Sequence, residues 1–133
     1  MQNHINQANH NQEFLDICEE KCPDSFFDWK TTIVFYIALH YLRAYHKMKG
    51  VKIDANHKDL LYHSNPNNSD AKNPLSKKAY DFYRDLFNSA HNSRYQGFLD
   101  KSNRMALMKF EFLQSKNNLS ELKKYLKNQG LKI

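Results

Sequence analysis

Arg84 and His91 stand seven positions apart in a segment that reads as one helix. Because each residue turns an α-helix by about 100°, a step of seven returns to nearly the same side, roughly two turns further on. The guanidinium of Arg84 offers paired donors to phosphate oxygens, and the imidazole of His91 can take up or release a proton near neutral pH. We therefore predict that this side of the helix can hold and cleave a phosphodiester.

Three further residues extend this candidate site. Asp85 follows Arg84 directly and is a candidate to orient either Arg84 or His91. Arg94 and Tyr95 lie just past the predicted helix, where a guanidinium can bind phosphate and a phenol can stack on a base. The alternative is that this pair only closes the end of a helical bundle. Arg84 and His91 are thus candidate catalytic residues, and Asp85, Arg94 and Tyr95 are candidate substrate-binding residues.

The other histidines carry weaker signals. His40 and His46 are six positions apart, about 240° around a helix, so they cannot grip one metal ion from a single face. We expect His40 to be a hydrogen-bonded interior or interface residue. His57 and His63 bracket a short polar segment, where we expect solvated or capping groups that could still meet a substrate phosphate if the loop folds over the site. We expect no metal and no cofactor.

Composition limits the class of protein. The chain has 133 residues, 41% of them hydrophobic, which is enough for one core and hence one domain. A net charge of +6 favours an anionic partner or a solvated lysine-rich surface. Cys18 and Cys22 match neither a redox CxxC motif nor a zinc site. Since no apolar run reaches the length of a membrane span or of a signal peptide, we expect a cytoplasmic protein that does not contact membranes.

The sequence predicts an all-α fold, because only three Gly and three Pro interrupt it and no stretch alternates polar and apolar residues for long enough to predict a strand. The first predicted helix covers residues 5–21, and Pro23 prevents its continuation. Asp24 or Ser25 is expected to cap the second helix, which runs to about Lys49. Its apolar surface is so wide that we expect it to be the central helix of a bundle.

The remaining chain predicts two more long helices and one short one. Residues 51–73 are polar and are expected to be mobile, with a short helix in NHKDLLYHS followed by the loop NPNNSDAKNP. Asn73 and Pro74 are expected to cap the third long helix. The fourth begins near residue 102 or 103, and its pattern leaves open whether Asn117 and Asn118 interrupt it. The expected architecture is an antiparallel bundle of four long helices with a short helix between the second and third.

Three segments of the sequence, in this order, resemble the bacterial HEPN-like domains. They are DWKTTIVFYIALHYLRAYHKMKG, the turn NHKDL, and AYDFYRDLFNSAHNSRY, and the resemblance covers residues 14–127. Catalytic members of that superfamily carry an Arg, often followed by a polar residue, and then a His after a spacer of four to six residues. Arg84, Asp85 and His91 fit this pattern at its long end, with six residues between the Arg and the His.

The resemblance implies metal-independent RNA cleavage by a homodimer in which two copies of the motif face each other. His91 would act as general base or general acid, and Arg84 would neutralise charge that grows on the phosphate. The resemblance also implies a toxin–antitoxin or defence system and a partner protein such as an antitoxin or a nucleotidyltransferase. The alternatives are a non-catalytic module that binds RNA, a nucleotide or a partner protein, and a purely structural dimer.

Overall fold

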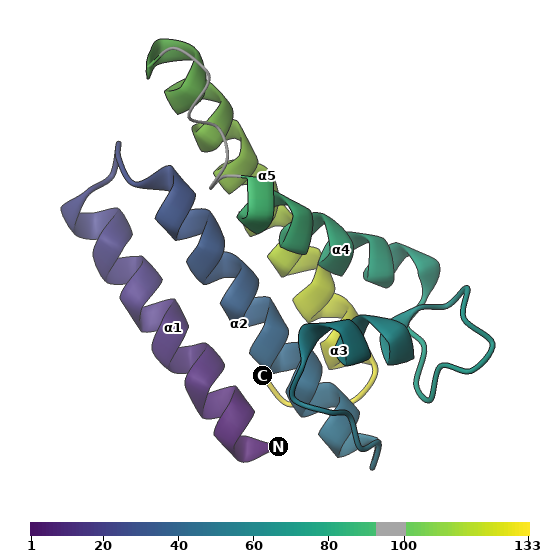
Figure 1. Ribbon diagram of the computed structural model, residues 1–133. Coiled ribbons are helices and arrows are strands. Elements are labelled where there is room, and N and C mark those ends of the chain that lie inside the picture. Colours follow the sequence, from purple (N-terminus) through teal and green to yellow (C-terminus); the bar gives the residue numbers. More distant parts are fainter. Residues whose placement is uncertain (93–100) are drawn as a thin grey trace.

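The computed structural model describes residues 1–92 and 101–133, leaving out the side chains of residues 101 and 102. Every regular element in the described part is a helix (Figure 1), so the all-α fold class is confirmed. The elements are α1 (Gln2–Lys21), α2 (Phe27–Met48), α3 (His57–Ser64), α4 (Lys77–Asn92) and α5 (Lys101–Asn128). No described helix has an apolar stretch long enough to cross a membrane.

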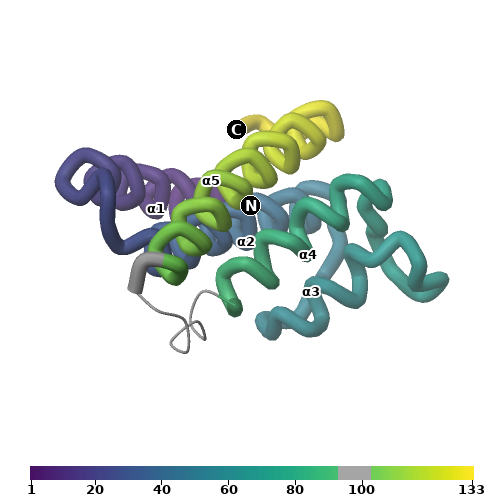
Figure 2. Tube along the Cα trace, turned by 90° about the horizontal axis from the view of Figure 1, so that it is seen from above, coloured from purple at the N-terminus to yellow at the C-terminus, as the bar shows by residue number. Residues whose placement is uncertain are grey.

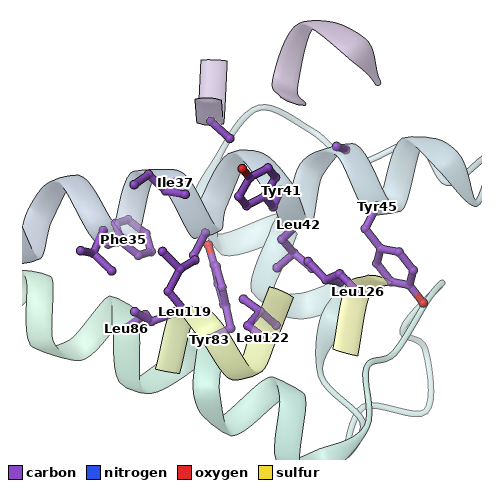
Figure 3. Close-up of a cluster of buried hydrophobic side chains, with 14 of the residues drawn as sticks. Phe35, Ile37, Tyr41, Leu42, Tyr45, Tyr83, Leu86, Leu119, Leu122 and Leu126 are labelled. Carbon is purple, nitrogen blue, oxygen red and sulfur yellow. The ribbon is translucent and has the colours of Figure 1, made fainter. Parts of the chain in front are cut away.

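Helix α2 is the central element, as its wide apolar surface predicts. It packs against α1, α4 and α5, and Figure 2 shows α1 and α4 on opposite sides of it. Leu42 of α2, Tyr83 and Leu86 of α4, and Leu122 and Leu126 of α5 are fully buried in the core between these helices (Figure 3). Removing each such side chain from water stabilises the fold by about 1.5–3 kcal/mol.

One side of α2 keeps two large aromatic side chains exposed. Trp29 and Tyr36 lie on this side, seven positions apart, and are 63% and 43% exposed. Arg43 continues the same line another seven positions along the helix and is partly exposed. Trp29, Tyr36 and Arg43 therefore form a row along α2, with two aromatic rings followed by a guanidinium.

The start of α2 differs from the prediction. The prediction that Asp24 or Ser25 caps the helix was wrong, because the N-cap residue is Phe26, whose side chain makes no capping hydrogen bond. Phe26 has a left-handed backbone with φ of 58°, which is uncommon for a residue other than glycine. The next residue, Phe27, is buried and packs on Phe112 of α5 with ring centroids 5.8 Å apart. Packing of Phe27 thus sets where the helix begins.

The short helix between α2 and α4 is confirmed. Asn56 is its N-cap residue, and the Asn56 side-chain oxygen accepts a hydrogen bond from the Asp59 amide at 2.7 Å. This is the ordinary way in which an asparagine satisfies one free amide of a first turn. The cap fixes where α3 starts and therefore where His57 lies.

The predicted cap of α4 was wrong. Asn73 bonds elsewhere: its amide donates to the carbonyl of His63 at 3.2 Å, and its side-chain nitrogen lies 3.0 Å from Nδ1 of His46. Ser76 takes the capping role, because its hydroxyl accepts from the Ala79 amide at 3.1 Å. Helix α4 consequently starts at Lys77.

Helix α5 runs without interruption through Asn117 and Asn118, which answers the question that its pattern leaves open. The residues after this pair return to the core at Leu119, Leu122 and Leu126. The cost of asparagine in a helix is a few tenths of a kcal/mol, far less than the burial of three leucines provides.

Candidate phosphate-binding site

Arg84 lies at the surface of α4 and is engaged by its own helix. Its side chain is 50% exposed, and Nη2 lies 3.3 Å from Oδ1 of Asp81. The guanidinium also lies over the ring of Tyr80, 6.0 Å from its centroid. Because helical side chains lean towards the N-terminus, Arg84 is held against the preceding turn. Asp85, the next residue, is exposed.

His91 is also exposed, two turns further along α4. Its ring stacks on that of Phe87, with centroids 6.1 Å apart and an interplanar angle of 23°. His91 lines a pocket of about 290 Å³ that also includes Tyr36 and Arg43 of α2 and His57 of α3. We call this cavity the His91 pocket. Arg84 is not among its lining residues.

His57 is held in place more firmly than the sequence suggests. Its ring stacks on Phe87 at 4.4 Å, and it meets Phe35 edge-on at 5.5 Å. Its Nε2 lies 2.9 Å from the hydroxyl oxygen of Tyr83. Burial, and then the positive charge of Arg43, lower the pKa of His57. The expectation of a solvated or capping group was therefore wrong for His57, which is a half-buried, neutral imidazole at pH 7.

The expectation was wrong for His63 as well. His63 is buried, its Nδ1 accepts a hydrogen bond from the Lys72 amide at 3.3 Å, and its Nε2 lies 3.5 Å from Asp59. These contacts tie the loop after α3 back onto α3. His63 thus has a structural role.

Arg43 is the functional candidate that the sequence analysis missed. Its Nη1 and Nη2 donate to the backbone oxygens of Asp54 and Ala55, at 3.2 and 2.6 Å. These bonds fasten the segment before α3 to α2, next to the His91 pocket. The helical spacing of the sequence places Arg43 on the same side of α2 as Tyr36. That His57 lines the same cavity as Arg43 follows only from the packing of α3.

The remaining predicted residues are distributed as follows. His40 is half-buried and its Nδ1 lies 3.0 Å from Nδ1 of His4, so it is a hydrogen-bonded residue as expected. Arg94 and Tyr95 lie outside the described residues. Across the described part of the chain, no three His, Cys, Asp or Glu side chains are grouped so that they could hold a metal ion.

Comparison with known proteins adds no relative. No protein-family model matches the sequence, and neither a search of curated proteins nor one of solved structures finds a match. The resemblance to HEPN-like domains therefore rests on residues of this chain alone, and the arrangement around His91 has to carry any functional argument.

Proposed function

We propose that this protein is a HEPN-like, metal-independent endoribonuclease that cleaves RNA at the His91 pocket. One observation carries the proposal: His57 of α3, His91 of α4 and Arg43 of α2 line the same cavity of about 290 Å³. Cleavage of RNA through its own 2′-hydroxyl needs a group that accepts a proton, a group that donates one, and a positive charge near the phosphate. Two imidazoles and a guanidinium supply all three.

In the proposed mechanism His57 is the general base. When Nε2–H of His57 donates to the Tyr83 oxygen, Nδ1 is the proton acceptor. His57 takes the proton of the ribose 2′-hydroxyl, and that oxygen attacks phosphorus. The bond from phosphorus to the 5′-oxygen breaks, and His91 gives a proton to the leaving oxygen. The products are a 2′,3′-cyclic phosphate and a free 5′-hydroxyl.

The arginines are proposed to act at different phosphates. Arg43 lines the pocket and stabilises the charge that develops on the reacting phosphate. Arg84, exposed and two turns from His91 on α4, binds a neighbouring phosphate of the strand in exchange for its ion pair with Asp81. Asp85, Arg94 and Tyr95 belong to the same proposal as further contacts to the RNA.

The biological part of the proposal comes from the resemblance. It comprises the antiparallel four-helix bundle, the homodimer, the toxin–antitoxin or defence role, and a protein partner such as an antitoxin or nucleotidyltransferase. Two exposed aromatic side chains on α2, Trp29 and the pocket-lining Tyr36, support a contact between two copies. The net charge of +6 supports an anionic substrate.

The test uses two oligonucleotides with the same order of bases in excess chelator. One is unmodified RNA, and the other lacks the 2′-hydroxyl at every position. The proposal predicts that only the unmodified strand is cleaved and that the new 3′ ends carry a 2′,3′-cyclic phosphate. Cleavage of both strands, or products with a 3′-hydroxyl, would contradict the mechanism, because neither is compatible with attack by a neighbouring ribose oxygen.

The second candidate function is a non-catalytic module that binds RNA, a nucleotide or a partner protein. The position of Arg84 favours it, because an exposed guanidinium outside the pocket can bind a phosphate without taking part in cleavage. This function predicts that the unmodified strand binds and stays intact under the same conditions. The two functions thus differ in the fate of one substrate.

A further inference from the structure

We propose that a second cavity, which we call the His4 pocket, binds a small phosphorylated ligand of the size of a mononucleotide. The cavity measures about 530 Å³ and lies between the start of α1, the last turns of α2 and the segment that precedes α3. This volume is within the range of small-molecule sites, which is about 300–1,000 Å³. The proposal goes beyond the proposed ribonuclease activity: His57 and His91 do not line this cavity, which shares only Arg43 and Ala55 with the His91 pocket.

Positive charge surrounds the His4 pocket. Arg43, Lys47 and Lys52 line it, and among its described lining residues none carries a carboxylate. Arg43 is fixed by its bonds to the backbone of residues 54 and 55, whereas Lys47 and Lys52 are exposed and can turn towards a bound anion. A dianionic phosphate is the group that three such cations attract most strongly.

A pair of histidines forms one wall. The Nδ1 atoms of His4 and His40 lie 3.0 Å apart, and the two rings stack with centroids at 5.3 Å. Only one proton can lie between the two nitrogens, so one neutral imidazole donates and the other accepts. The pair then keeps one Nε2–H donor and one Nε2 acceptor. The Nε2–H group adds a neutral donor to the charges of Arg43, Lys47 and Lys52.

His46 also lines the pocket but is already satisfied. The Ser64 hydroxyl donates to the Leu60 carbonyl at 2.7 Å, so Nε2–H of His46 donates to Ser64 at 2.8 Å. Nδ1 of His46 then accepts from the side-chain nitrogen of Asn73 at 3.0 Å. His46 is thus a rigid part of the wall, and the ligand contacts fall to the two lysines, Arg43 and the His4–His40 pair.

The rest of the lining suits an uncharged ring. Val51, Ile53 and Leu60 contribute apolar surface to the same cavity. A ligand with a phosphate at one end and a flat apolar group at the other, as in a nucleoside monophosphate, matches both parts of the wall. A bare phosphate would use only the cations and should bind more weakly.

The test is isothermal titration calorimetry with three probes, 5′-AMP, adenosine and inorganic phosphate, on the full chain. We expect 5′-AMP to bind, and both adenosine and inorganic phosphate to bind at least tenfold more weakly. The variant Lys47→Ala/Lys52→Ala should weaken 5′-AMP binding at least tenfold, as expected for the loss of charge-assisted hydrogen bonds. The control Lys78→Ala/Lys109→Ala makes the same change in net charge at exposed positions outside the pocket and should bind like the wild type.

Several results would overturn the proposal. These are no binding of 5′-AMP at millimolar concentration, equal binding of adenosine, or equal losses in the two double variants, which would indicate only general charge attraction. Loss of 5′-AMP binding in His91→Ala would place the ligand in the His91 pocket instead. Because RNA cleavage is not measured, failure here leaves the proposed ribonuclease activity untouched.

Discussion

The Nε2 atom of His57 lies 2.9 Å from the hydroxyl oxygen of Tyr83. Tyr83 is completely buried, and burial raises its pKa well above its usual range, so it stays a neutral phenol. One imidazole of the candidate site is thereby fastened to the centre of the core, and Phe87 stacks against the same ring. This anchoring gives the site a rigid side, on which a catalytic group can be held in a productive orientation.

The pH dependence of cleavage should report His57. Burial and Arg43 lower its pKa below 6.5, so a base at this position is deprotonated and active at neutral pH. We expect the cleavage rate to fall in acid, as the pH drops through this lowered pKa. In His57→Gln, which can keep a hydrogen bond to Tyr83, the residual rate should lose this acidic limb. A limb that persists in His57→Gln would assign the titration to another group.

Removing Asp81 should strengthen RNA binding. The Asp81 carboxylate lies 3.3 Å from the Arg84 guanidinium and 3.1 Å from the Lys77 ammonium, so it neutralises part of both charges. We expect Asp81→Asn to bind RNA several-fold more tightly in fluorescence anisotropy at low salt. Unchanged or weaker binding would show that Arg84 does not contact the strand.

The matching loss should appear in Arg84→Ala. If Arg84 binds one phosphate, its removal should weaken RNA binding about tenfold and reduce the slope of log affinity against log salt by about 1. The control is Lys78→Ala, which removes an exposed cation of the same helix. Lys78 is the neighbour of Lys77, the lysine that forms an ion pair with Asp81. An equal loss in both variants would indicate a general effect of net charge.

The stability of the fold should fall in mild acid because of His46. Its side chain is 1% exposed, and burial, together with the nearby His63 and Arg43, lowers its pKa from 6.5 to about 4. Between these two values the unfolded chain binds a proton that the folded chain does not, so stability decreases as the pH falls from about 6.5 to 4. His46 alone should account for about 3 kcal/mol between pH 7 and pH 4.

Urea unfolding at pH 7, 6, 5 and 4 measures this effect. His46→Gln should be less stable at pH 7, where a buried hydrogen-bonded group is replaced, but should lose less stability on acidification than the wild type. His10→Gln, a change at an exposed position on α1, should follow the wild-type curve. Identical pH slopes in His46→Gln and the wild type would disprove the role of His46.

The sequence predicts the helices better than their ends. The all-α class, the short α3 and its neighbours follow from periodicity, which is a local signal. The cap that the structure shows at Asn56 is local as well. The predicted caps at Asp24 or Ser25 and at Asn73 failed for a different reason. Phe27 is drawn into the core, and Asn73 bonds to His46, so long-range contacts override the local preference.

The candidate site could be predicted only in part for the same reason. Arg84 and His91 share one helix, so their common side follows from a step of seven positions. The His91 pocket, however, combines residues from α2, α3 and α4. No local pattern relates Arg43 to His57, because their proximity depends on the hydrogen bonds of Arg43 to the backbone of residues 54 and 55.

The most direct measurement is RNA cleavage in excess chelator by three proteins: the wild type, His91→Ala and His10→Ala. Both histidines are exposed, so neither change should alter the melting temperature. The account predicts that His91→Ala cleaves about 10²–10⁴-fold more slowly, as expected for loss of a proton donor, while His10→Ala equals the wild type. A folded His91→Ala protein that cleaves at the wild-type rate would contradict it.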